Sequence, residues 1–247
     1  MRGILTSFVC LFGLVAASGC GSSDNPPGPL SKHFDEMYIA ALPLDQKATV
    51  VSSQQNWNVA RMENANADAQ VKEADSQLHQ ARNDQKATRL AMDSAASNKK
   101  SADSSADMTR INAAAKDQAT ANDVGKAADA RVKYLETYRA YLGRFLRYTQ
   151  ENMYFREAEF ESAKAQLAKT NNIAPKGVTY ESFPKQVDER RSRTESAKAK
   201  SESAKASVSA QRDNWLHIQE NADKENGHAS VYWDPMAPKV QPTTSSN

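Results

Sequence analysis

The chain is poor in proline, glycine and aromatic residues. Its 247 residues include nine prolines and nine glycines, and aromatic side chains make up only 7 % of the total. So few turn-forming residues argue against sheet-rich folds and against most α/β enzymes. Hydrophobic residues make up 39 % of the chain. Many of these are alanine, which occurs 39 times and whose side chain buries little area. This composition excludes a thick apolar core and favours long helices rich in Ala, Lys, Glu, Gln and Ser.

No charge of one sign dominates the sequence. There are 32 basic and 30 acidic residues, which leaves a formal net charge of +2. The two signs alternate along the chain, as they do on a solvated helical surface. A nearly neutral chain gives no electrostatic reason to expect binding to nucleic acid or general binding to anionic lipid.

Cysteine is also scarce, and both cysteines, Cys10 and Cys20, lie in the first twenty residues, MRGILTSFVCLFGLVAASGC. A positive Arg2 precedes an apolar stretch at 4–15 that is too short to span a bilayer. Small residues then lead to Cys20. This pattern resembles the lipobox of bacterial lipoproteins, although Ala17 stands where such boxes usually carry leucine. The rest of the chain is not assigned to a family.

The resemblance implies that residues 1–19 are a signal peptide and that Cys20 is the lipid attachment site. The mature chain would then be anchored to the membrane by acyl chains and contain neither a free thiol nor a disulfide. Gly21 directly after the cysteine, instead of Asp, implies the outer membrane of a double-membrane bacterium. The alternative is an ordinary secretory signal cut near Ala17 or Gly19.

Four segments are expected along the chain. After the signal, residues 20–43 are predicted to be a lipidated flexible tether, because GSSDNPPGPLSK is rich in Ser, Gly and Pro. Residues 44–222 predict the long-helix domain, since no proline occurs between Pro43 and Pro175. Residues 223–247 predict a mostly irregular tail, in which residues 229–233 either pair as a short strand or dock on the helices.

The expected fold is all-α: an elongated antiparallel coiled coil of about three long helices, at 44–97, 104–171 and 184–222. One seam is thin, because steps of seven residues lead through Ala60, Ala67, Ala74, Ala81, Thr88 and Ala95. Two places are candidates for the first turn, 97–105 and 120–125. Neither is marked by proline, so a continuous helix that pairs in an oligomer is left open.

Alignment of the large side chains favours the first turn. A turn near residue 101 sets Trp57 opposite Phe145, and the second turn sets Trp215 opposite residue 140, so that the large residues gather at one level. The candidate core anchors are Trp57, Leu142, Phe145, Val208, Trp215 and Ile218.

No motif in the sequence points to catalysis. The four histidines have no other histidine or cysteine at ligand spacing, and no phosphate-binding loop or nucleophile elbow is present. We therefore expect no metal, no cofactor and no enzymatic activity. A basic cluster of Arg190, Arg191 and Arg193 is a candidate patch for an acidic partner or lipid headgroups; a solvated helix face is the simpler interpretation.

These observations predict a lipid-anchored cell-envelope protein that acts as a structural spacer or assembly scaffold through protein–protein contacts. Its partners would be other copies of the chain or other envelope proteins, and not nucleic acid. The hairpin tip at 97–105 or the tail from Asn226 would be the contact surface. The alternatives are a periplasmic holdase-like chaperone and a hairpin adaptor of an export or efflux assembly. The sequence leaves open the oligomeric state and whether the protein faces the periplasm or the cell surface.

Overall fold

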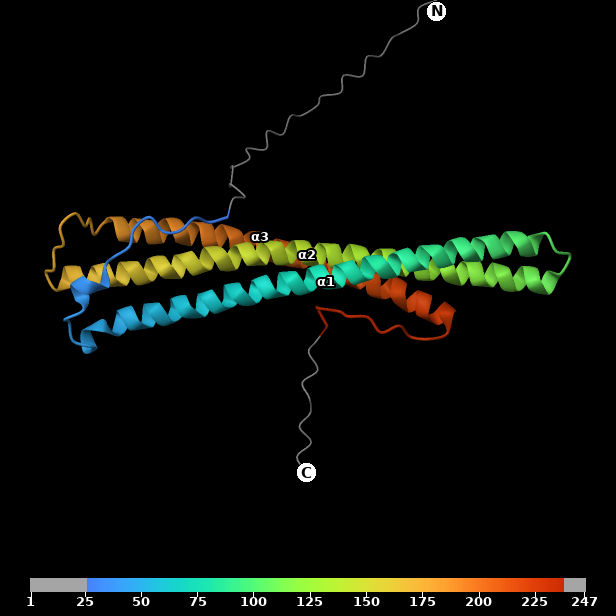
Figure 1. Ribbon diagram of the computed structural model, residues 1–247, viewed down its shortest axis with the longest axis horizontal. Coiled ribbons are helices and arrows are strands. Elements are labelled where there is room, and N and C mark those ends of the chain that lie inside the picture. The colour runs from blue at the N-terminus through green and yellow to red at the C-terminus, as the bar shows by residue number, and fades with distance from the viewer. Residues whose placement is uncertain (1–25, 238–247) are drawn as a thin grey trace, which may run out of the picture.

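The computed structural model describes residues 26–237, which are helical with no strand (Figure 1). Three long helices dominate: α1 (Ala48–Asp103), α2 (Met108–Thr170) and α3 (Ser182–Asn226). Two short 3-10 helices, η1 (Glu36–Ile39) and η2 (Asp45–Lys47), precede them. The predicted all-α, elongated antiparallel fold is confirmed. In the part of the chain that is described, no helix has an apolar run of the length that crossing a bilayer requires.

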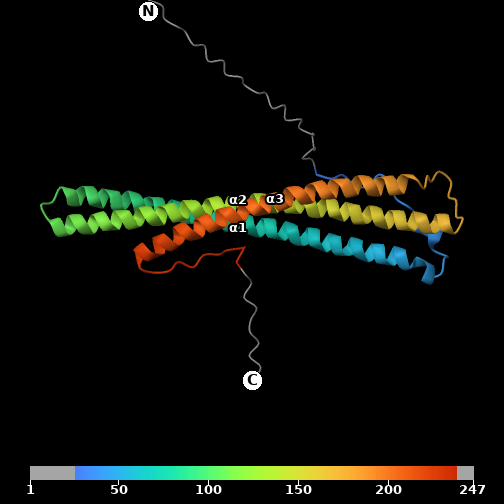
Figure 2. The ribbon, with the colours of Figure 1, turned by 180° about the vertical axis from the view of Figure 1, so that it is seen from behind.

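Helix α2 is the central helix of the rod. Its 63 residues span about 95 Å, and both α1 and α3 pack against it. At the end where α3 begins, α2 lies between α1 and α3, whereas near the middle of the rod α3 crosses over α2 (Figures 1 and 2). Beyond the end of α3, only α1 and α2 continue, side by side, to the first turn.

The first turn lies at residues 104–107 and overlaps the C-terminal end of the favoured candidate, 97–105. Asp107 caps α2, because its carboxylate accepts hydrogen bonds from the backbone N–H groups of Thr109 and Arg110. At the rejected candidate, Gly125 lies inside α2 instead. A side chain there would meet the sulfur of Met92 on α1, so this glycine permits a close approach of the two helices.

The second turn follows the stop signals of the sequence. Asn172 has a left-handed backbone, with φ of +54°, just after α2 ends. Pro184 stands in the first turn of α3, where its missing N–H costs nothing. At the other end of α3, Gly227 adopts φ of +75° and terminates the helix, four residues later than expected.

The register of the helices differs from the prediction. The ring of Trp57 stacks on Phe160, 5.7 Å between centroids, and not opposite Phe145. Trp215 stacks on Tyr134 at 5.2 Å. A hairpin pairs residues symmetrically about its centre, and the contacts of Asn64 with Thr149 and of Asp75 with Arg139 put that centre near residue 107 instead of 101. The position opposite Trp57 therefore moves by about twelve residues, to within one helical turn of Phe160. The large side chains therefore do not gather at one level but are spread along α2.

The core consists of separate clusters joined by a thin seam. Along the predicted seam of α1, Ala60, Ala67, Ala74 and Ala81 are buried, whereas Thr88 and Ala95 are only half-buried. At the middle of the rod, all three helices contribute to one cluster that includes Leu78, Leu135 and Val208. A second cluster lies at the end of the rod where α3 begins and includes Phe160 and Phe183.

Residues 26–43 differ from the predicted flexible tether, because they pack along α2 and α3. Leu30, Phe34 and Ile39 are buried against the helices, and Phe34 is only 2 % exposed. These apolar residues recur every four or five positions within a polar stretch, and that spacing lets one side of the segment be buried. Residues 20–25 of the predicted tether lie outside the described residues.

Candidate interaction sites

Residues 227–237, here called the C-terminal strap, turn back from the end of α3 and run along the rod (Figure 1). They form no strand; of the two alternatives, docking on the helices is the one observed. Two carboxylates fix the strap. Asp223 of α3 accepts hydrogen bonds from the backbone N–H and hydroxyl of Ser230, at 3.1 and 2.9 Å. Asp234 accepts from the hydroxyl of Tyr134 at 2.7 Å and from Nε of Arg212 at 2.8 Å.

Aromatic contacts add to these hydrogen bonds. The guanidinium of Arg131 lies 4.2 Å from the ring centre of Tyr232, and Trp233 packs edge-on against Tyr138. Beneath the strap lies the stacked pair of Tyr134 and Trp215. The strap thus covers the cluster in which all three helices meet.

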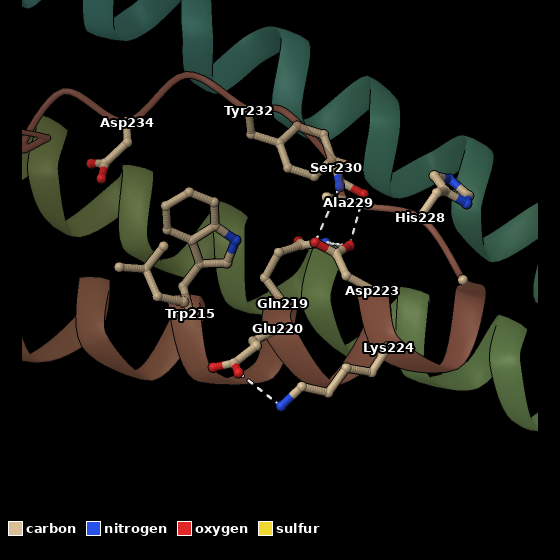
Figure 3. Close-up of a pocket in the computed structure, with 12 residues that line it drawn as sticks. Trp215, Gln219, Glu220, Asp223, Lys224, His228, Ala229, Ser230, Tyr232 and Asp234 are labelled. Carbon is tan, nitrogen blue, oxygen red and sulfur yellow. Dashed lines mark hydrogen bonds and ion pairs between the residues drawn. The ribbon is translucent and has the colours of Figure 1, made fainter. Parts of the chain in front are cut away.

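An open groove of about 690 Å³ lies between the strap and the last turns of α3 (Figure 3). The indole nitrogen of Trp215 points toward it but is buried and has no hydrogen-bond partner. The charged groups of the groove are engaged: Glu220 pairs with Lys224 at 2.7 Å, and Asp223 accepts hydrogen bonds from Ser230 of the strap. We assign the groove no chemistry. Among residues 26–237, no group of three or more His, Cys, Asp or Glu side chains is placed to hold a metal ion.

The ionisation of Asp234 couples the strap to pH. Burial by itself raises the pKa of Asp234, but the hydrogen bonds from Arg212 and Tyr134 outweigh it and hold the pKa below the usual 3.8. In turn, burial and the bond to Asp234 raise the pKa of Tyr134. Because a lowered carboxyl pKa favours the ionised, docked state, this stabilisation is present above about pH 4 and is lost as the pH falls through the lowered pKa.

Substitution of Asp234 by asparagine is expected to loosen the strap at neutral pH. The hydrogen-bonded backbone amides of Ser230 and Met236 should exchange with solvent about tenfold faster, because the hydrogen bonds to the Asp234 carboxylate are weakened and the strap opens more often. Native-state hydrogen exchange measures this directly. The matched control is Asp213→Asn, since Asp213 also lies near Arg212 but is exposed. Equal exchange in wild type and Asp234→Asn at pH 7 would show that Asp234 does not hold the strap.

A buried ion cluster joins α2 to α3. The carboxylate of Glu151 is 3 % exposed and accepts hydrogen bonds from Arg147 at 2.8 Å and Arg193 at 3.1 Å. Arg190 approaches the same carboxylate at 3.8 Å and donates hydrogen bonds to the carbonyls of Gly28 and Pro29.

The prediction that Arg190, Arg191 and Arg193 form a free basic patch is therefore wrong. Arg190 is buried and Arg193 is bound to Glu151, whereas Arg191 is exposed and pairs with Asp188. The period of the helix explains the difference: positions 190 and 193 face α2, and position 191 points outward.

The predicted core anchors divide into two groups. Leu142, Val208 and Trp215 are buried, as predicted. Trp57, Phe145 and Ile218 are only half-buried. Phe145 belongs instead to a row of neighbouring rings along one side of α2, which consists of Tyr138, Tyr141, Phe145 and Tyr148.

Sequence reasoning missed Glu151, Asp234 and Phe34. No local signal distinguishes the two carboxylates from the many solvated ones. The apolar spacing around Phe34 was the one available hint. The predicted lipid attachment site, Cys20, lies outside the described residues.

No family model matches the chain, and comparisons with curated proteins and with solved structures gave no match.

Proposed function

We propose that this protein is a lipid-anchored scaffold or spacer of a bacterial cell envelope, held at the outer membrane through Cys20 and acting through protein–protein contacts. The observation that carries the proposal is the rod itself: one uninterrupted helix of 63 residues supports two further long helices along its length. Such a shape gives reach and a large exposed surface for partners. The lipobox-like sequence before Cys20 supplies the anchor.

The hairpin tip, taken from here on as residues 90–120 so that it includes the predicted 97–105, is the part of the rod best placed to meet a partner. The last residues of α3, Glu225 and Asn226, line a groove with residues near 88 and 120, so beyond this level α1 and α2 have no third helix. Two apolar side chains are exposed in this part, Leu90 at 70 % and Met108 at 65 %. Exposed apolar residues on a helix pair are suited to a partner helix.

Photo-crosslinking in the source cells tests this proposal. A photoreactive amino acid is placed at Leu90 or Met108, and, as the matched control, at exposed Gln80 in the three-helix part of the rod. We expect the tip positions to give one defined product, either with a second copy of the chain or with one envelope protein. A smear of many envelope proteins would support a holdase-like chaperone instead. A defined product from Gln80 with none from the tip would contradict the assignment of the tip.

A further inference from the structure

The N-terminal segment is fixed to the side of the rod. Lys32 and Gln186 exchange two hydrogen bonds, each of 3.0 Å, between a backbone and a side-chain amide. The backbone N–H of Phe34 donates to the buried carboxylate of Glu161 at 2.6 Å. With Pro27, Leu30 and Phe34 buried as well, the chain is held from Pro27 onward.

The chain consequently leaves the rod along its length and not at an end. Gly28 is bonded to Arg190, which in turn lies against Glu151 of α2. Glu151 is about 28 Å along the helix from Thr170, where α2 ends, and about 65 Å from Met108 at the hairpin tip. Figure 1 shows the first described residues, in blue, beside α3.

The chain between the proposed anchor, Cys20, and the rod is shorter than the distance from the exit point to either end of the rod. Seven residue steps separate Cys20 from Pro27, the first buried residue. Whatever their conformation, seven residues span at most about 25 Å. In an upright rod, the exit point would stand at least about 28 Å above the bilayer, which is its distance from the nearer end of the rod. A chain anchored at Cys20 cannot bridge that distance, so neither end of the rod can stand on the membrane.

The charge near the exit point is consistent with this orientation. Arg147, Arg190 and Arg193 surround the single carboxylate of Glu151, and exposed Arg144 lies one turn before Arg147. Only Arg144 of these four is exposed, so it is the guanidinium best placed to meet a phosphate group. The outer face of α3 itself alternates in sign, so it is the short anchor that sets the orientation.

From this geometry we infer, resting on the acylation of Cys20 proposed above, that the rod lies along the bilayer with the outer face of α3 near Ser192 toward the phospholipid headgroups. Both ends of the rod then stay close to the membrane. The hairpin tip remains the contact surface offered to other proteins, and the outer face of α3 is taken up by the membrane.

Distances to the membrane test this orientation. The acylated full chain is placed in vesicles of phosphatidylethanolamine and phosphatidylglycerol that carry a headgroup energy acceptor. Since the mature chain would have no cysteine other than Cys20, single cysteines at exposed positions can carry a donor dye: Ala106→Cys and Lys176→Cys at the two ends, and Ser192→Cys and Asn58→Cys on the outer faces of α3 and α1.

We expect energy transfer from both ends of the rod, and stronger transfer from position 192 than from position 58. An upright rod would instead show transfer from one end alone, because the ends would differ in height by about 95 Å. That result, or stronger transfer from position 58, would overturn the inference.

A longer anchor provides the matched control. Twelve Gly and Ser residues inserted between Asn25 and Pro26 lift the restriction, so transfer from position 106 should fall. The same insertion after Gly177, in the loop between α2 and α3, should leave it unchanged. Flotation with the vesicles and the mass of the N-terminal peptide report acylation separately. A chain without acyl groups contradicts the proposed function, whereas an acylated, upright rod contradicts the orientation alone.

Discussion

Replacement of Trp215 by alanine is expected to lower the free energy of unfolding by about 3–5 kcal/mol, more than any single alanine-to-serine change in α1. Trp215 is 2 % exposed, and its ring lies nearly parallel to that of Tyr134 in the cluster shared by all three helices. Truncation would leave a cavity that the long, stiff helices cannot close. Denaturant unfolding followed by far-UV circular dichroism measures the effect.

Two further variants separate the causes of that loss. Trp215→Phe keeps the aromatic stack and removes an indole N–H that has no partner, so it should cost much less than alanine. Trp57→Ala removes a half-buried ring stacked on Phe160 and should also cost less. A loss below about 1 kcal/mol for Trp215→Ala would contradict the packing of α3 on α2 described above.

Loss of Glu151 is expected to be of similar size, about 3–5 kcal/mol, because removal of one partner from a buried ion cluster leaves the others without compensation. Three arginines, Arg147, Arg190 and Arg193, would then face one another between α2 and α3. Glu151→Gln keeps the shape of the side chain and removes the charge, so it isolates the electrostatic part of the effect.

The matched control for this prediction is Glu159→Ala. Glu159 lies on the same helix and also pairs with an arginine, Arg156, but both side chains are considerably more exposed. Its loss should cost about 1 kcal/mol or less. Equal stability of Glu151→Gln and wild type, measured in parallel denaturant titrations, would show that the buried charge does not hold α3 in place.

Most of the helical organisation could be predicted from local sequence. The absence of proline between Pro43 and Pro175, and the stop signals before Pro184, placed the helices to within a few residues. The alanines spaced by seven residues identified the buried seam of α1. These features depend on backbone propensity and on periodicity, both of which are visible within a short window of sequence.

The pairing between distant residues could not be predicted in the same way. The register depends on the exact place of the first turn, which is formed by the capping carboxylate of Asp107 and has neither glycine nor proline. Tyr134 and Asp234 are separated by 100 positions, and nothing near either residue predicts their hydrogen bond. The apolar spacing near Phe34 does not by itself predict that this segment packs against α2 and α3.

The measurement that tests the central claim most directly is the distribution of the protein between membrane and soluble fractions of its source cells, for wild type and for Cys20→Ser. The account predicts that wild type sediments with the outer membrane and that its N-terminal peptide begins at Cys20 with the mass of attached acyl chains. It also predicts that Cys20→Ser moves to the soluble fraction of the envelope with its helical rod intact. A Cys20→Ser protein that stays with the membrane, or a wild-type peptide without acyl chains, would contradict the lipid anchor.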